Sequence, residues 1–534
     1  MAIPQPHLLS DIPAEFRPNT APYERLYLLD GEVSTWDGPL HEVSSPICTV
    51  PANGGAPART ILGQVPAMAP DAALAALNAA VRAWDSGRGA WPTSSVAQRI
   101  AAVEAFAERM VHTREEVVKL LMWEIGKTLD DSRKEFDRTV DYIRRTVDAL
   151  READRVNTQF LEDEGTVAQV HRAPLGVCLC MGPFNYPLNE TYTTLIPALI
   201  MGNTLVVKPP KFGVLAHQPL LAAFAECFPP GVVNFIYGDG SVIIGPILQT
   251  GSVDVLAFIG SSGVADVLKK QHPHPHRMRS ILGLDAKNPA LIMPDADLDT
   301  AVRECIAGSL SFNGQRCTAL KILFVHESIA DEFLTRFATQ VKALPLGFPW
   351  DKGAKITPLP EQNKIQRLTD LVQDAVSRGA RVVNEGGGIT SETFFAPAVV
   401  YPVAPAARLY TEEQFGPIVP VCSYRDPQEF LDYVTQSNYG QQVSLFGRDA
   451  GQLAALIDPL SNQVCRINLN AQSQRGPDTL PFTGRKNSAE GTLSITDALR
   501  SFSIRSLVAT KADPAQPNLL KQIATSGKSR FIKS

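Results

Sequence analysis

The chain has 534 residues, too many for one small core, so we expect two or three packed units. With 44% apolar residues, 20% charged residues and a net charge of −5, its composition is that of an ordinary globular enzyme. We see no basic stripe for nucleic acid and no polybasic or long apolar segment for a membrane. The eight cysteines lack framework spacing and the start lacks a secretory signal, so we expect a cytoplasmic location.

The first part of the chain divides into an irregular segment and a helical segment. Residues 1–60 are rich in proline and glycine and are expected to form an irregular or short-strand lead-in. The clearest helix spans residues 95–110, where apolar residues recur at three- and four-residue steps. We expect Thr113 and Glu116 to form a capping box, and a further amphipathic helix to cover residues 128–150.

From residue 169 onward, short strands alternate with short helices. The predicted strands lie at 175–181, 204–207, 232–237 and 255–259, with helices at 218–227, 242–248 and 264–270. The second half repeats this pattern, with strands at 290–293, 322–325 and 381–383 and helices at 298–308, 330–344 and 362–378. Residues 500–508 are a weak strand and 514–534 a loose polar tail. The alternation predicts βαβ units and parallel sheets, whose ligands bind beyond the carboxyl ends of the strands.

The run from His272 to His276, His-Pro-His-Pro-His, raises the question of a metal site. Its X-Pro steps hold the segment extended, and no carboxylate or cysteine lies close by in the sequence. We therefore interpret it as a surface loop and predict no metal.

Cys317 is the candidate nucleophile. It follows Arg316, and an adjacent guanidinium favours the thiolate, which is the nucleophilic form of the side chain. The alternative is a small buried apolar residue, the common state of an intracellular cysteine. The rest of the chain has to decide between these two interpretations.

Four other segments follow predicted strands or carry suitable polar groups. Asn185, in a strand-to-helix turn, has an amide that can donate to an oxyanion, although an ordinary turn asparagine is the alternative. Lys208 and Lys211 follow a strand and suit the anionic groups of a nucleotide. Residues 260–263 open a helix and suit a phosphate.

The fourth segment contains Glu413 and Phe415, which can bracket a ribose and a flat ring. Together these segments resemble the aldehyde dehydrogenase superfamily. The resemblance rests on residues 183–187, 208–211, 260–262, 314–317 and 413–417, which occur in the family's order and rough spacing, and it extends over about residues 60–510.

The resemblance implies an α/β fold with a Rossmann-like cofactor domain, an α/β catalytic domain and a small β oligomerisation arm. The boundaries that we expect are 1–60 for the lead-in, 61–154 and 173–286 for the cofactor domain, 287–485 for the catalytic domain, 155–172 and 498–511 for the arm and 512–534 for the tail. It also implies a small-molecule aldehyde substrate and a homodimer or homotetramer.

The resemblance assigns site residues as well. Cys317 would attack the aldehyde, and the Asn185 amide with the Cys317 backbone N–H would hold the oxyanion. The residues expected to bind the cofactor are Pro183, Phe184, Lys208, Pro210, Lys211, Gly240, Gly260, Ser261, Glu413 and Phe415. A lysine at position 211 cannot accept from a ribose hydroxyl but can neutralise a 2′-phosphate, which predicts NADP, with NAD as the alternative.

Within the superfamily, the chain is most similar to the non-phosphorylating glyceraldehyde-3-phosphate dehydrogenases. Arg138, Arg316 and Arg475, with Tyr186, match the residues that surround the substrate phosphate in that family. Taken singly, each arginine is equally well an ordinary salt-bridge residue. The expected reaction is therefore the NADP-dependent oxidation of glyceraldehyde 3-phosphate to 3-phosphoglycerate.

One expected residue is missing. Relatives activate the water that releases the acid with a glutamate 34 residues before the cysteine, and here that position is Gly283. Asp285 is one candidate replacement, another carboxylate is a second, and transfer of the acyl group to a thiol such as coenzyme A is a third. We favour hydrolysis with a displaced base. A catalytically silent binding or structural protein on the same fold is the alternative from another class.

Overall fold

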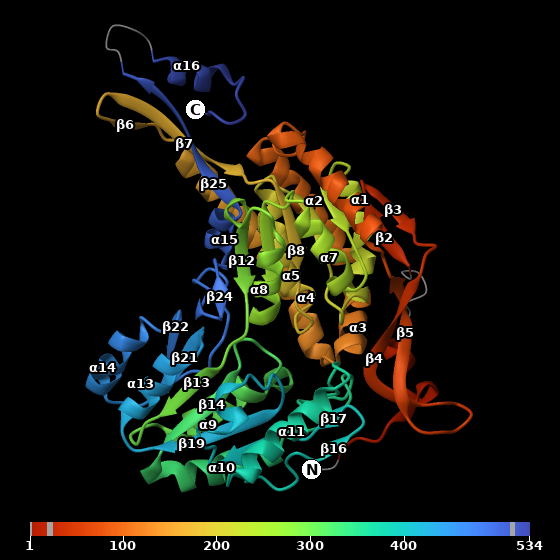
Figure 1. The fold of residues 1–534 in the computed structure, drawn as a ribbon, viewed down its shortest axis with the longest axis vertical. Helices are drawn as coiled ribbons and strands as arrows, with labels where there is room; N and C mark the ends of the chain where they lie inside the picture. Colours follow the sequence, from red (N-terminus) through yellow and green to blue (C-terminus); the bar gives the residue numbers. More distant parts are fainter. Residues whose placement is uncertain (1–2, 19–24, 513–517, 534) are drawn as a thin grey trace.

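The computed structural model describes residues 3–18, 25–512 and 518–533, and its largest sheet is built from the predicted βαβ units. Within these residues the sheet has eight strands, in the order β24, β12, β11, β8, β9, β10, β2, β3. The parallel strands are β8 (Val177–Met181), β9 (Thr204–Lys208), β10 (Val233–Phe235), β11 (Val255–Ile259) and β12 (Arg279–Gly283). These strands are apolar along most of their length because helices cover the sheet (Figure 1).

Helices that follow the strands complete this first unit. They are α5 (Asn189–Ile200), α6 (Leu221–Cys227), α7 (Gly240–Gln249) and α8 (Ser262–Gln271). The prediction of βαβ units in this half of the chain is confirmed. The predicted helix 218–227 begins instead as a 3-10 turn at Leu215–Leu220, which contains Pro219.

Four more helices precede this alternation: α1 (Pro70–Trp84), α2 (Val96–His112), α3 (Arg114–Ile125) and α4 (Leu129–Asn157). A capping box between Ser95 and Gln98 starts α2. The predicted capping box at Thr113 and Glu116 is wrong. Only one residue separates α2 from α3, and the Thr113 hydroxyl donates to the Met110 carbonyl at the end of α2 (2.8 Å).

The prediction of an irregular or short-strand lead-in agrees with the short strands of residues 1–60 and is wrong for one long strand. An eleven-residue strand, β4 (Leu40–Val50), pairs with β5 (Ala58–Pro66) and β1 (His7–Leu8). β2 (Leu26–Leu29) and β3 (Glu32–Thr35) extend the large sheet, because β2 pairs antiparallel with β10. The prolines and glycines lie mostly in the connections between these strands. They make the composition of the segment look irregular although it contains strands. Residues 1–2 and 19–24 lie outside the described part of the chain.

The second unit contains another sheet. Among the described residues it has seven strands: β15 (Arg381–Val382), β18 (Ala398–Tyr401), β19 (Ile418–Tyr424), β14 (Leu320–His326), β13 (Asn288–Ile292), β21 (Gln442–Phe446) and β22 (Arg466–Leu469). All neighbours are parallel except β15 and β18. Its helices are α9 (Leu298–Leu310), α10 (Ala330–Lys342), α11 (Lys364–Ser377), α12 (Arg408–Thr411), α13 (Pro427–Gln436) and α14 (Ala450–Leu460).

The chain itself joins these units, and the remaining strands form short pairs. The chain passes from β12 to β13 and returns through β24 (Ala489–Glu490), which pairs antiparallel with β12. The remaining pairs are β16 (Thr390–Ser391) with β17 (Phe394–Phe395) and β20 (Tyr439–Gly440) with β23 (Arg485–Lys486). Both sheets therefore contribute to the region where the two units meet.

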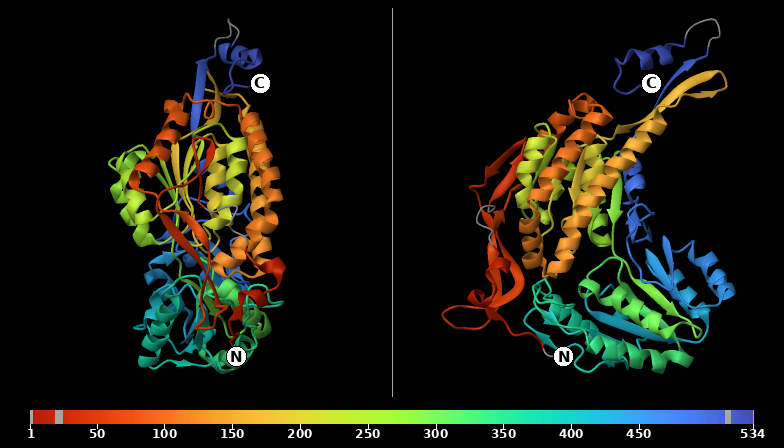
Figure 2. Two further views of the ribbon diagram at one scale, coloured as in Figure 1. Left: turned by 90° about the vertical axis from the view of Figure 1, so that its right-hand side faces the viewer. Right: turned by 180° about the vertical axis from the view of Figure 1, so that it is seen from behind.

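An arm projects from the body of the molecule (Figures 1 and 2). It consists of β6 (Leu161–Asp163), β7 (Thr166–Pro174) and β25 (Ser503–Lys511), paired antiparallel. The weak strand predicted at 500–508 begins later, because α15 (Ile495–Ser501) takes up its first residues.

The tail is more ordered than the sequence indicates. The prediction of a loose segment is wrong for residues 518–533, where α16 (Leu519–Ser526) buries Leu520 and Ala524 together with Ile532. Residues 513–517 and 534 lie outside the described residues. Within the ranges that the structure describes, no helix has the length and apolar character needed to cross a membrane.

Candidate active site

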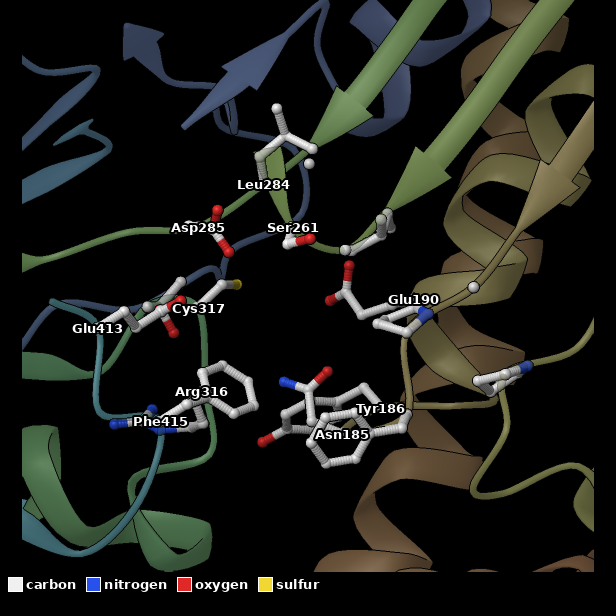
Figure 3. Close-up of a pocket in the computed structure, with 18 of the residues that line it drawn as sticks. Asn185, Tyr186, Glu190, Ser261, Leu284, Asp285, Arg316, Cys317, Glu413 and Phe415 are labelled. Carbon is white, nitrogen blue, oxygen red and sulfur yellow. The ribbon is translucent and has the colours of Figure 1, made fainter. Parts of the chain in front are cut away.

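A cavity of about 1060 Å³ lies where the carboxyl ends of the first sheet meet the second unit (Figure 3). The sequence predictions converge here. The predicted residues that line it are Arg138, Pro183, Phe184, Asn185, Tyr186, Lys208, Pro210, Lys211, Gly260, Ser261, Asp285, Arg316, Cys317, Glu413, Phe415 and Arg475. Gly240 is the exception, since it begins α7 behind Lys208 and is not part of the lining.

A tight turn carries Cys317 into this cavity. Phe312, Asn313 and Gly314 all have positive φ angles, of 49°, 56° and 69°. A Cβ atom on Gly314 would lie 2.7 Å from the carbonyl oxygens of both Ser309 and Gly416, so only glycine fits. The Asn313 side chain fixes the turn through hydrogen bonds with Thr357.

Two side chains orient the Cys317 peptide. Asn288 Nδ2 and Lys321 Nζ donate to the Cys317 carbonyl at 2.8 and 2.9 Å. From the other unit, Asn185 Nδ2 donates to the carbonyl of Gln315 at 2.8 Å, which ties the asparagine to the nucleophile loop. The Cys317 sulfur points into the cavity, and Asn185 lies across from it (Figure 3).

The pKa of Cys317 is raised, mainly by burial and then by the negative charge of Glu190, against the opposing effect of Lys321 and Arg475. The charges that oppose this rise most are those of Lys321 and Arg475, and the stabilisation of the thiolate by Arg316 stays a prediction. Arg316 Nη2 donates to the carbonyls of Ala307 (3.1 Å) and Gly308 (2.7 Å) near the end of α9. Sequence adjacency does not determine where a long side chain points.

The cofactor side of the cavity contains a half-buried cation, Lys208. Burial lowers the pKa of Lys208 to about 8, although the charge of Asp239 acts in the opposite direction. Its ammonium donates to the carbonyl of Pro209 at 3.1 Å. Lys211 lies exposed at the rim. The two lysines are placed to meet an anionic ligand.

Asp285, the predicted replacement base, is committed elsewhere. Its Oδ2 accepts from both the backbone N–H and the hydroxyl of Ser262, each at 2.8 Å, at the start of α8. Ser261 also caps this helix, by accepting from the Val264 N–H. The Asp285 carboxylate therefore serves the N-terminus of α8.

Glu413 and Phe415 lie on the opposite wall. Glu413 forms an ion pair of 2.6 Å with the buried Lys321 and accepts from the Ala286 N–H at 3.3 Å. The Phe415 ring meets that of Phe184 edge-on, with the centroids 5.8 Å apart. These residues form a partly apolar wall with one fixed carboxylate.

The three predicted phosphate-binding arginines differ in their surroundings. Arg475 uses all three nitrogens, donating to Asp478, Glu190 and the Leu493 carbonyl. Arg138 makes a two-point contact with Asp478 at 2.7 and 3.1 Å. No carboxylate of the described residues pairs with Arg316, and its buried Nε has no partner there.

Glu190 is the site residue that sequence reasoning missed. It is the second residue of α5, is buried, and turns its carboxylate into the cavity towards Cys317 (Figure 3). A signal was present in the sequence, because Glu190 is the one charged residue between Arg172 and Lys208. A lone charge on a fully buried helix needs a partner or a function.

A buried ion pair positions the turn before α5. Glu135, paired with Lys127, accepts from the backbone N–H groups of Leu188 (3.0 Å) and Asn189 (3.1 Å). The Lys127 ammonium donates to the carbonyl of Asn185 at 2.8 Å and lies 3.6 Å from the centre of the Tyr186 ring. Asn185 and Glu190 thus belong to one braced segment.

Comparison with known proteins identifies this arrangement. The sequence profile of the "Aldehyde dehydrogenase family" matches residues 54–508. The chain belongs to the aldehyde dehydrogenase family. The expected family, the α/β fold and the activity class, an aldehyde oxidoreductase, are confirmed.

Relatives within the family are similar over most of their length. An NADP-dependent glyceraldehyde-3-phosphate dehydrogenase of Streptococcus equinus is 33% identical over 84% of this chain and 92% of its own. The protein of the same name from Arabidopsis thaliana is 30% identical over 79% and 85%. A crystal structure of that enzyme from Bacillus halodurans C-125, complexed with NADP, matches 92% of this chain and 100% of its own with a TM-score of 0.84 and 30% identity.

The position of the usual family base is vacant in this member. Gly283 ends β12 and lines the cavity. A Cβ atom there would lie 3.3 Å from Leu493 and 3.4 Å from Ile259, so a side chain fits with a small adjustment. The chain therefore accommodates a Cβ atom at this position but carries no carboxylate there.

Proposed function

We propose that this enzyme oxidises an aldehyde to a carboxylic acid with NADP, using Cys317 as the nucleophile. The observation that carries this proposal is the shared cavity, in which Cys317 and Asn185 face the strand ends that suit a nucleotide. A half-buried ammonium at Lys208 fits a dinucleotide phosphate, and Gly260 and Ser261 also line the cavity. NADP is the cofactor named for the relatives in Streptococcus, Arabidopsis and Bacillus, and Lys211 suits its 2′-phosphate.

The proposed reaction assigns a separate role to each of three residues. The Cys317 sulfur forms a bond to the aldehyde carbon, and the oxyanion accepts hydrogen bonds from the Asn185 amide and the Cys317 N–H. NADP, when bound, supplies the hydride acceptor. Glu413, fixed by Lys321, holds the ribose on the other wall. The acyl group that remains on Cys317 is then released by water.

We further propose that the substrate is a short phosphorylated aldehyde, glyceraldehyde 3-phosphate, and the product 3-phosphoglycerate. Arg316 supports this assignment, because its guanidinium lacks a described carboxylate partner and its buried Nε still needs an acceptor. Arg138 contributes a second cation to the lining of the cavity. Arg475 is fully engaged, so we assign it to holding Glu190 and Asp478 rather than the phosphate.

The replacement Arg316→Ala tests the substrate. We expect the KM for glyceraldehyde 3-phosphate to rise by about ten- to a hundredfold, since a charged hydrogen bond contributes about 1.5–3 kcal/mol. The KM for unphosphorylated glyceraldehyde is expected to change little. Arg303→Ala, a replacement of an exposed arginine on α9, is the control. An equal loss for both aldehydes would refute the phosphate assignment.

Gly283 favours a second candidate, in which coenzyme A takes the acyl group. The protein is mixed with NADP and glyceraldehyde 3-phosphate, and NADPH is followed by absorbance. Steady turnover without added thiol supports hydrolysis, whereas a single stoichiometric burst that coenzyme A relieves supports acyl transfer. The absence of any NADPH formation, as a burst or as turnover, would support the catalytically silent alternative.

The arm leads to a proposal about assembly. β25 leaves Ile504 and Leu507 49% and 62% exposed, which is unfavourable for an isolated chain in water. We propose that the arm contacts another copy of this chain in a homodimer or homotetramer.

A further inference from the structure

The release of the acyl group needs a base, and five carboxylates line the described part of the cavity. They are Glu190, Asp285, Glu361, Glu412 and Glu413. A general base must lie within reach of a water that attacks the thioester carbon on the Cys317 sulfur. This requirement follows from the proposed function and becomes void if that function fails.

All five carboxylates have partners, and four of them are held against the cavity wall. Asp285 is bound by Ser262, and Glu413 by Lys321. Glu412 receives two hydrogen bonds from Arg408, at 2.8 and 3.0 Å, and Glu361 pairs with Lys364 at 2.6 Å. Each of these contacts draws the carboxylate to the wall of the cavity.

Glu190 differs from these in direction. Its carboxylate projects from α5 into the open part of the cavity and faces the Cys317 sulfur (Figure 3). Its charge has the largest effect of any charged group on the pKa of Cys317, which agrees with this placement. Arg475 contacts Oε2 and so fixes the orientation of the carboxylate.

We propose that Glu190 is the catalytic base that releases the acid, in place of the glutamate that is absent at position 283. A water enters between the Glu190 carboxylate and the thioester carbon. Glu190 takes one proton as the water oxygen bonds to that carbon. The resulting oxyanion, held by Asn185, re-forms the carbonyl and expels the Cys317 thiolate. The proton then passes from Glu190 to solvent, and the acid departs.

The replacement Glu190→Gln removes the base but keeps an oxygen that can accept from Arg475. We expect a burst of about one NADPH per active site, followed by turnover that is slower by about 10²–10⁴-fold. Intact-protein mass spectrometry should show the acyl group accumulating on Cys317. Glu226→Gln, an exposed glutamate on α6, is the matched control and should behave like the parent.

Two rescues separate a base from a structural residue. Hydroxylamine attacks a thioester without needing a base, so it should restore turnover of Glu190→Gln. The double replacement Glu190→Gln, Gly283→Glu should also regain turnover, since position 283 accommodates a side chain. A residue that only maintained the fold would respond to neither treatment.

Three results would overturn the assignment of Glu190. Glu190→Gln could turn over at the parent rate, or it could lose the burst and the turnover to the same extent. Alternatively, the acyl-enzyme could accumulate in Asp285→Asn and not in Glu190→Gln. If Glu190→Gln does not fold, Glu190→Asp retains the charge on a shorter side chain and should show the same preserved burst with slower turnover. A parent protein that forms no NADPH at all would refute the proposed function itself, a result that is distinct from these.

Discussion

Cys317 lies in a cavity where burial and the charge of Glu190 both hold its pKa above the ordinary range. In the free enzyme the thiolate fraction at neutral pH is therefore small, and it increases only as the pH rises beyond the normal cysteine range. An approaching cofactor or aldehyde changes this environment. The reactivity of the free thiol and that of the working enzyme should consequently differ.

Glu190→Gln should make the free thiol more reactive. Removing the negative charge lowers the pKa of Cys317, so we expect alkylation by iodoacetamide at pH 8 to accelerate by about two- to fivefold. The rate is measured from the loss of free thiol, with Cys317→Ala as the blank. A rate equal to that of the parent would mean that Glu190 does not act on the sulfur.

Lys208 predicts a pH dependence of cofactor binding. Its pKa of about 8 means that the ammonium is present below pH 8 and is lost as the pH rises. At pH 9 about a tenth remains charged, so the Kd for NADP should rise by up to about tenfold between pH 7 and 9. Fluorescence titration measures this Kd. Lys208→Arg should remove the dependence, and a flat profile in the parent would contradict the assignment.

Prediction from sequence succeeded for residues at strand ends and failed for side-chain direction. Asn185, Lys208 and Ser261 follow predicted strands, Cys317 precedes one, and the parallel sheets bring strand ends together without further information. Glu190 lies inside a helix, where no strand-end rule applies. The paths of Arg316 and Arg475 depend on carbonyls and carboxylates that only the folded chain brings into reach.

At the scale of elements, the turn before Cys317 depends on a residue without a side chain. Gly314→Ala should destabilise the protein by about 1–3 kcal/mol, because its Cβ would collide with two carbonyl oxygens and φ is positive. Activity should fall with it. Urea denaturation measures the stability.

Gly353→Ala is a matched control for that replacement. Gly353 also has a positive φ, of 84°, but no atom lies within 4 Å of the added Cβ. The free energy of unfolding of Gly353→Ala should fall only by the smaller amount that backbone strain causes. This variant should keep its activity. Equal losses for the two variants would show that the collision at Gly314 is relieved by a small movement.

The elements that sequence reasoning misplaced share a physical cause. β4 and β5 gain their stability from pairing with each other and from α3 rather than from local propensity. The helix α16 is stabilised by burying Leu520 against a residue as distant as Phe160. A local sequence pattern does not reveal contacts between distant segments. It does reveal the regular alternation of strands and helices from residue 175 to residue 270.

At the scale of the whole molecule, the arm should determine assembly. Leu507→Asp places a charge on the exposed face of β25, and we expect the oligomer to dissociate into smaller species. Analytical ultracentrifugation measures the mass. Ser506→Asp, at a neighbouring position on the same strand, is the control for the added charge. An unchanged mass for Leu507→Asp would locate the interface elsewhere.

The buried pair of Lys127 and Glu135 has a consequence for redesign. It holds the backbone at Asn185 and Leu188, and therefore both ends of the segment that carries Asn185 and Glu190. Libraries that aim to widen the range of accepted substrates should leave this pair untouched, although it lies behind the reaction chamber. The useful diversity lies instead at Arg138 and Arg316, whose replacement alters the chamber wall without disturbing that brace.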